Sequence, residues 1–148
     1  MKKKTGLEVV FAAHPRSRYD LYPEHLYNRK CFFNKTAELV KNSKIVLLHT
    51  TTSLSFAVLF KKPTIFLTSD EIKKSYDDFK INSYSREMNS PLFNIDDKNN
   101  FNKINNSKNY FSFDQEKYQE YFEKYLKFPG SPDNFLWNIL LDNFSDTV

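Results

Sequence analysis

The sequence predicts an α/β fold in which a parallel sheet is flanked by helices. The first observation is the run Ile45–Leu48, four successive apolar residues, which is typical of a strand buried on both faces. The second is the dense apolar segment 54–60, a helix that Pro63 stops because proline cannot continue a helix. The third is a second apolar strand at 64–67. Strand, helix and strand in this order predict a parallel pair with a right-handed crossover.

Length and composition bound the classes of protein that the chain can represent. The chain has 148 residues, about one domain on the usual length prior, and a formal net charge of +4. That charge permits a phosphorylated ligand or an anionic membrane surface nearby without demanding either. The basic residues are scattered apart from Lys2–Lys4, so no nucleic-acid-binding stripe is indicated. No apolar stretch approaches about 18 residues, the length that predicts a membrane span.

Cysteine usage indicates the redox compartment. Cys31 is the single cysteine, so neither an internal disulfide nor a cysteine metal site is predicted, and a reducing compartment is the default. We therefore expect a cytoplasmic protein, with peripheral association at the inner membrane left open. The first strand begins almost at once, which suggests a chain cut from something larger or one half of a two-domain protein.

Two strands and a helix are predicted before the central unit. The segment Leu7–Ala13 is mostly apolar and rich in β-formers, which favours a buried strand. Residues 31–33 form a short apolar run that suits an edge strand. A helix is predicted from Lys35, with Asn34 as its cap, and it ends at 42–43.

The chain after the second central strand is predicted to be mostly helical. Ser69 or Asp70 is expected to cap a helix that runs to about Phe79. Residues 81–109 are poorly patterned, and seven of the sixteen residues 94–109 are Asn, so we expect an irregular surface segment. A short strand is expected near 110–113.

A helical tail is predicted over residues 114–148, and the whole of residues 7–148 is interpreted as one α/β domain. Asp114 is expected to cap a helix to about Lys127, whose apolar face consists of Tyr118, Tyr121, Phe122, Tyr125 and Leu126. Asp133 is expected to cap a last helix through about Phe144. The apolar face of that helix is wide, and it either docks on this domain or meets a partner surface.

Polar residues follow two of the predicted strands, and we expect both groups at the same rim of one sheet. His14, Arg16 and Arg18 follow the first strand, and His49 to Ser53 follow the central strand. Ligands of open α/β sheets bind at the carboxyl ends of the strands, where a helix amino terminus also favours anions. Guanidinium groups and several hydroxyls suit a phosphate or diphosphate. The alternatives are a polar loop cap for the first group and a Thr-rich loop with one capping hydroxyl for the second.

Other kinds of site are disfavoured by the residues. The two glycines, Gly6 and Gly130, lie outside the strand–helix turns, so neither a dinucleotide loop nor a P-loop is predicted. No carboxylate is close in sequence to His14 or His49, so no metal site is expected. Glycines of a nucleophile elbow are absent around Ser53.

Four segments together carry a resemblance to a known family. They are residues 13–16 (AHPR), 36–40 (TAELV), 49–57 (HTTTSLSFA) and 62–67 (KPTIFL). In this order the segments resemble the carboxyl-terminal half of a GT-B glycosyltransferase, a Rossmann-like domain. More narrowly, they are similar to bacterial surface-carbohydrate or capsule biosynthesis proteins and to bacterial sialyltransferases, which share a comparable His-Pro motif and a Ser/Thr pair. The resemblance covers about residues 7–72.

The resemblance implies roles for individual residues. His14 would be catalytic, contacting the donor phosphate and stabilising the leaving group, whose charge grows in the transition state. Thr52 and Ser53 would bind that phosphate, and Glu71 is the nearest match to an acidic residue that holds the ribose. The full donor-binding set comprises Arg16, His49, Thr51, Thr52, Ser53 and Glu71.

The resemblance also implies partners. The ligand would be a CMP-, CDP- or UDP-linked sugar, with no further cofactor. The amino-terminal acceptor domain of such enzymes, which usually holds the general base, is absent, so we expect a donor-binding half that is inactive alone. Two alternatives remain open: a nonhydrolysing nucleotide-sugar epimerase, and a non-catalytic interaction module with the same fold.

Overall fold

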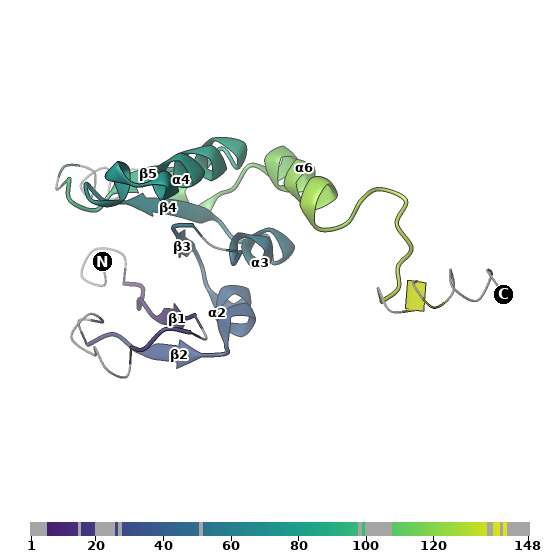
Figure 1. Cartoon of the computed structure of the whole chain (residues 1–148), viewed down its shortest axis with the longest axis horizontal. Coiled ribbons are helices and arrows are strands. Elements are labelled where there is room, and N and C mark those ends of the chain that lie inside the picture. Colours follow the sequence, from purple (N-terminus) through teal and green to yellow (C-terminus); the bar gives the residue numbers. More distant parts are fainter. Residues whose placement is uncertain are drawn as a thin grey trace.

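A computed structural model of the chain gives the arrangement shown in Figure 1. The structure describes residues 6–14, 16–19, 26, 28–50, 52–97, 99, 108–135, 138, 139 and 141. The architecture is α/β, as the sequence predicts, but the strands form two small parallel sheets instead of one.

The two sheets divide the strands in chain order. In the first sheet, β1 (Phe11–Ala13) pairs in parallel with β2 (Cys31–Phe33). In the second sheet, β4 (Thr64–Thr68) lies between β3 (Val46–Leu48) and β5 (Leu92–Asn94), and both pairings are parallel. Figure 1 shows the two-stranded sheet below the three-stranded one. Within the described residues, the expectation of one continuous sheet is therefore wrong.

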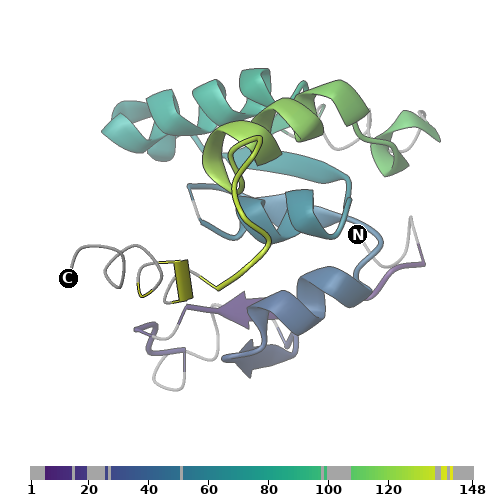
Figure 2. The same ribbon diagram turned by 90° about the vertical axis from the view of Figure 1, so that its right-hand side faces the viewer.

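Four helices and two short 3₁₀ turns in the described part of the chain have defined bounds. They are α2 (Thr36–Asn42), α3 (Leu54–Leu59), η2 (Ile72–Lys74), α4 (Tyr76–Glu87), η3 (Lys108–Phe111) and α6 (Gln115–Tyr125). Helix α4 packs on β4, α6 packs on α3, and α2 contacts both α3 and β1. Figure 2 shows α4 and α6 on one side of the three-stranded sheet and α2 beside the two-stranded sheet. No helix among the described residues has the length and apolarity needed to cross a bilayer.

The hydrophobic core belongs to the three-stranded sheet and the helices around it. Phe66, Ala57, Ile81 and Met88 are fully buried. The core cluster also contains Val40, Val46, Leu48, Leu54, Val58, Tyr118 and Tyr121. β1 and β2 contribute no residue to this cluster. The apolar stripe predicted for α6 is confirmed at Tyr118 and Tyr121, whereas Tyr125 is half exposed.

Several predicted elements are confirmed. β2, β3 and β4 lie where apolar runs predicted strands, and α2 ends at Asn42. α3 occupies the predicted segment after the hydroxyl-rich turn. The Asp114 side chain caps α6, because it accepts a hydrogen bond from the Lys117 backbone N–H at 3.1 Å.

Elements before the central unit differ from prediction at their starts. The first strand begins only at Phe11, not at Leu7. Asn34 does not cap α2, since Lys35 holds the N-cap position without a side-chain cap bond. Asn34 instead has a φ of +56°, a left-handed conformation that Asn tolerates better than most residues.

Larger differences follow β4. The helix expected from Ser69 or Asp70 to Phe79 is instead the short turn η2 followed by α4, which Ser75 caps and which continues to Glu87. The segment expected to be irregular contains β5. A 3₁₀ turn, η3, replaces the strand expected near 110–113.

Residues 126–135, which follow α6, run away from the sheets and helices in Figure 1. Residues 138, 139 and 141 are helical, and Phe135 and Leu141 are 80% and 63% exposed. An exposed face is the alternative that the sequence left for the last helix, and Phe135 and Leu141 agree with it. Lys2–Lys4, Leu136 and Trp137 lie outside the described residues.

Candidate functional site at the carboxyl edge of the three-stranded sheet

Strand register brings the ends of β3, β4 and β5 together. Leu48 is the partner of Phe66, and Thr68 is the partner of Asn94. Because the strands are parallel, the segments that follow them leave the sheet at one edge, where ligands of α/β sheets bind. This carboxyl edge therefore collects the loop 49–53, the loop 69–71 and the residues after Asn94.

The loop after β3 presents imidazole and hydroxyl groups. His49 and Thr52 are exposed, and Ser53 is half-buried; Thr51 lies outside the described residues. Ser53 occupies the N-cap position of α3 but has helical backbone angles, with φ −64° and ψ −14°, and its side chain makes no cap hydrogen bond. Ser53 itself is therefore not the one capping hydroxyl of the alternative interpretation, which nothing in the described residues tests at Thr51. No acidic residue stands in the loop or in the first turn of α3.

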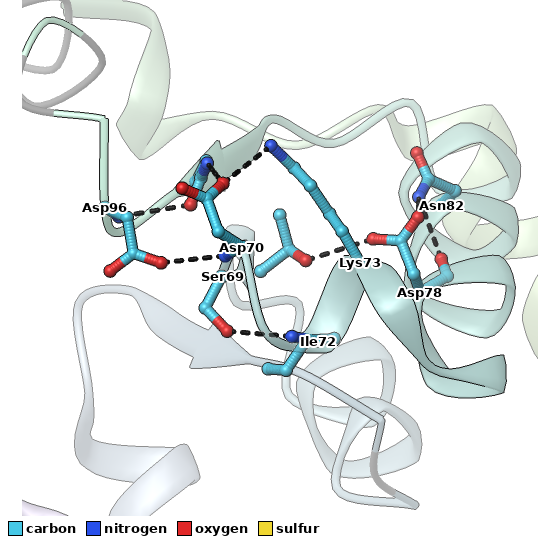
Figure 3. A network of polar contacts seen from close by, with 9 residues as sticks. Ser69, Asp70, Ile72, Lys73, Asp78, Asn82 and Asp96 are labelled. Atoms are coloured by element: carbon cyan, nitrogen blue, oxygen red, sulfur yellow. Dashed lines mark hydrogen bonds and ion pairs between the residues drawn. The ribbon is translucent and has the colours of Figure 1, made fainter.

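The end of β4 presents carboxylates held by an ordered network (Figure 3). Asn94 Nδ2 donates to Asp70 Oδ1 at 2.7 Å, and Lys73 Nζ donates to the same oxygen at 3.2 Å. The backbone N–H of Asp70 donates to Asp96 Oδ2 at 2.7 Å. The hydrogen bond from Asn94, with that from Lys73 next, lowers the pKa of Asp70 below its usual value. Asp70 is thus a carboxylate at neutral pH, and it joins the end of β4 to the end of β5.

A second part of the same network fixes α4 against β4 (Figure 3). The buried Thr68 hydroxyl donates to Asp78 Oδ1 at 3.0 Å, and Asn82 Nδ2 donates to Asp78 Oδ2 at 2.9 Å. The Ser69 hydroxyl accepts from the backbone N–H of Ile72 at 3.1 Å, which starts η2. These contacts are structural, because each one satisfies a polar group of the fold. Glu71 follows Asp70 and is exposed.

His14 and Arg16 stand at the end of β1, in the other sheet. Both are exposed. The backbone N–H of Arg16 donates to His14 Nδ1 at 3.1 Å, so in the neutral imidazole Nε2 carries the proton. The expectation that His14 and His49 share the rim of one sheet is wrong, because β1 and β3 belong to separate sheets. Pro15, between His14 and Arg16, lies outside the described residues.

Sequence reasoning missed the residues that organise this edge. Asn94 and Asp96 were assigned to an irregular segment, although the apolar pair Leu92–Phe93 after Pro91 was a signal for a short strand. Asp78 was not singled out because the sequence predicts a helix start at Ser69 or Asp70, whereas α4 begins at Tyr76 and Asp78 lies in its first turn. Within the described residues, no group of three His, Cys, Asp or Glu side chains is placed to hold a metal ion.

The carboxyl edge is divided by charge, and that division limits what it can bind. The β3 side offers His49 and hydroxyls without a carboxylate, whereas the β4 and β5 side offers Asp70, Glu71 and Asp96. Hydroxyl and imidazole donors suit phosphate oxygens, and carboxylates suit the hydroxyl groups of a sugar. Comparison with protein-family models, curated proteins and solved structures found no match. The chemistry of the edge is thus the basis for assigning a function.

Proposed function

We propose that this chain binds a nucleotide-activated sugar at the carboxyl edge of β3, β4 and β5, as the donor half of a GT-B-type glycosyltransferase in bacterial surface-polysaccharide biosynthesis. The observation that carries the proposal is the division of that edge by charge. A nucleotide sugar has an anionic phosphate between two polyhydroxyl rings, so it needs phosphate donors and hydroxyl acceptors side by side.

The two sides of the edge match those two needs. His49, Thr52 and Ser53 would meet the phosphate, and the absence of acidic residues in their loop avoids repulsion of its charge. Glu71 is exposed on the side that would face ribose or sugar hydroxyls. Asp70 already accepts two hydrogen bonds, which connect the ends of β4 and β5. We therefore assign the main contact with the sugar hydroxyls to Glu71 and not to Asp70.

The reaction would be completed by a second domain. An acceptor hydroxyl oxygen would form a bond to the anomeric carbon while the bond from that carbon to the phosphate oxygen breaks. The bonding electron pair would leave with the phosphate, and the acceptor proton would pass to a base on the other domain.

In this proposal His14 keeps the role of a leaving-group contact, and Arg16 keeps that of a donor-binding residue. His14 is exposed, and its Nε2–H is available to donate when Nδ1 accepts from Arg16. β1 belongs to the other sheet, so His14 and the loop after β3 could contact the same phosphate only if the ends of both sheets lie close to it. His14 is therefore tested separately from the β3 loop.

The experiment is a titration of the full chain with CMP, CDP, UMP, UDP and GDP, followed by amide chemical shifts. We expect saturable binding of one nucleotide, with shifts at His49, Thr52 and Ser53. Ser53→Ala should weaken binding by about tenfold through loss of a phosphate contact. Ser131→Ala in the tail is the matched control and should bind normally.

Each outcome has a defined meaning. If no nucleotide shifts the β3 loop, or if Ser53→Ala binds as tightly as the control, the donor site is not at this edge. If Ser53→Ala weakens binding and His14→Ala does not, the phosphate site stands but His14 is not part of it. Product analysis with the acceptor domain present would separate sugar transfer from epimerisation.

A further inference from the structure

A second candidate site lies at the opposite edge of the three-stranded sheet. The turn before β3 contains Lys44, and the turn before β4 contains Lys61 and Lys62. These turns are neighbours because Val46 is the register partner of Thr64, and the Val46 N–H donates to the Pro63 carbonyl at 2.9 Å. Together they border a pocket of about 550 Å³.

The lining of this pocket has one sign of charge. Among its described lining residues, Lys44, Lys61 and Lys62 are basic and none is acidic. Leu7 and Phe111 add apolar surface, and Phe111 is 51% exposed. Another pocket, of about 520 Å³ between α3 and α6, is lined by Glu116, two glutamines and apolar side chains as well as Lys61, so it does not offer the same charge.

Most other lysines of the described chain have an acidic partner. Ion pairs with carboxylates involve Lys30, Lys35, Lys73, Lys80, Lys117, Lys124 and Lys127. In the same described residues, no ion pair involves Lys44, Lys61 or Lys62. Among the described residues these three ammonium groups share one pocket without a carboxylate partner, and a bound anion would offset their mutual repulsion.

The backbone of Lys61 is a second, independent sign that its side chain is used. Helix α3 ends in a Schellman motif, in which Lys62 N–H donates to Ala57 O at 2.8 Å and Lys61 N–H donates to Val58 O at 3.0 Å. Lys61 therefore holds the left-handed position that glycine usually fills, with a φ of +50°. A left-handed backbone at a non-glycine residue motivates the hypothesis that its side chain has a function.

We propose that the pocket formed by Lys44, Lys61, Lys62 and Phe111 binds a phosphate group carried by an organic molecule. Three ammonium donors would neutralise the phosphate, and Phe111 and Leu7 would contact the group attached to it. This phosphate is separate from the proposed donor site, because the two lie at opposite ends of parallel strands. It can belong to a soluble phosphate ester or to a lipid headgroup, and these sources share the same chemistry.

The test uses the full chain and two double variants of equal charge. Lys44→Gln with Lys61→Gly removes two of the pocket cations, and glycine suits the left-handed backbone at position 61, so the fold should be kept. Lys41→Gln with Lys74→Gln removes two exposed lysines that have no ion pair in the described chain and do not line the pocket. Circular dichroism and thermal unfolding establish that both variants are folded.

Two ligand arms distinguish the sources of phosphate. In the first arm, inorganic phosphate, pyrophosphate and glycerol 3-phosphate are titrated while amide shifts are recorded. In the second arm, the chain is sedimented with phosphatidylcholine vesicles that do or do not contain phosphatidylglycerol. We expect saturable binding in at least one arm, centred on Lys44, Lys61 and Lys62, weakened about tenfold in the pocket variant and unchanged in the control.

Both kinds of result are decisive. Binding in the first arm identifies a soluble phosphate ester, and binding only to the anionic vesicles identifies a headgroup. The proposal is overturned if neither arm shows saturable binding, or if the control variant loses as much binding as the pocket variant. Shifts confined to His49 and Thr52 would also overturn it while leaving the donor-site proposal standing.

Discussion

Four described residues other than glycine have a left-handed backbone, a conformation that most side chains disfavour. Asn28, Asn34, Lys61 and Asn89 have positive φ angles, and Asn tolerates this region because its short side chain can hydrogen-bond locally. Asn89 follows α4 as Lys61 follows α3, with the same Schellman pattern of backbone hydrogen bonds. Lys61 is the exception among the four, because the lysine side chain has no short polar group that could hydrogen-bond to the nearby backbone in this conformation.

Replacing Lys61 by glycine should therefore stabilise the protein. Relief of left-handed strain outweighs the greater entropy of glycine in the unfolded chain, for a net gain of about 0.5–1 kcal/mol. That gain should raise the melting temperature by about 1–4 °C. Thermal unfolding followed by circular dichroism measures it.

The control for this prediction is Lys61→Ala, which removes the same charge without relieving the backbone. Alanine should leave the melting temperature close to that of the unchanged protein, since it has the same Cβ clash as lysine in a left-handed conformation. If alanine and glycine stabilise equally, the gain comes from reduced charge repulsion among Lys44, Lys61 and Lys62, and the strain argument fails.

At the scale of one helix, Tyr118 attaches α6 to the start of β4. Its ring is buried, and its hydroxyl donates to the Lys62 carbonyl at 2.7 Å. The same hydroxyl lies 3.1 Å from Thr64 Oγ1, which in turn lies 2.8 Å from Ser90 Oγ. Burial raises the pKa of Tyr118 to about 12, with the hydrogen bond from Thr64 acting in the opposite direction. The α6 attachment thus depends on a neutral phenol.

The raised pKa of Tyr118 predicts a loss of stability in alkali. The folded-state pKa lies above the unfolded value of 10.0, so the stabilising contribution is complete below pH 10 and disappears as the pH rises toward 12. The free energy of unfolding should fall by about 1.4 kcal/mol between pH 9 and pH 11 from this group alone. Urea unfolding at each pH measures the fall.

Two phenylalanine variants separate Tyr118 from the other titrating groups. Tyr118→Phe should be less stable at pH 7 by about 1–2 kcal/mol, because the Lys62 carbonyl loses its donor, but its alkaline slope should be shallower. Tyr76→Phe, at a residue that is 73% exposed, should keep the slope of the unchanged protein. Equal slopes in all three proteins would show that Tyr118 ionises at an ordinary pKa.

Elements were predictable where local sequence decides them. Ile45–Leu48 and Thr64–Leu67 are apolar runs bounded by polar turns, and Asp114 precedes a stripe of helical period, so β3, β4 and α6 follow from local patterning. β5 was missed because its apolar signal is only the pair Leu92–Phe93, which stands in a mostly polar segment. Its pairing depends on β4, which sequence patterning does not reveal.

The candidate site was predictable only in part, for a related reason. Placement of His49, Thr52 and Ser53 at a strand end follows from the β3 pattern. Their neighbours Asn94 and Asp96 could not be predicted without β5. His14 was assigned to the same rim because the sequence contains no signal for a break between β1 and β3, and that break is a tertiary feature.

At the scale of the whole molecule, the two sheets differ in how they are stabilised. The core cluster is built from β3, β4 and the helices around them, and β1 and β2 add nothing to it. The described contacts of the smaller sheet are local: Phe11 N–H donates to Lys30 O at 2.8 Å, Phe11 and Tyr19 place their rings 6.4 Å apart, and α2 contacts β1. Regions with few buried apolar contacts open at lower free energy than the core.

We therefore expect the two sheets to exchange their amide hydrogens with different free energies. The Phe66 N–H, which donates to Pro91 O at 2.8 Å inside the core, should require global unfolding. The Phe11 N–H should exchange through a local opening that costs at least about 2 kcal/mol less.

Phe66→Leu makes the comparison independent of absolute rates, because it should lower the exchange free energy of core amides by about 1–2 kcal/mol and leave that of Phe11 unchanged. If Phe11 loses protection in step with the core, the sheets unfold as one cooperative unit. If Phe11 is unaffected, the smaller sheet opens independently of the three-stranded sheet. A ligand that contacts both the His14 loop and the β3 loop would then have to hold the two sheets in one fixed arrangement.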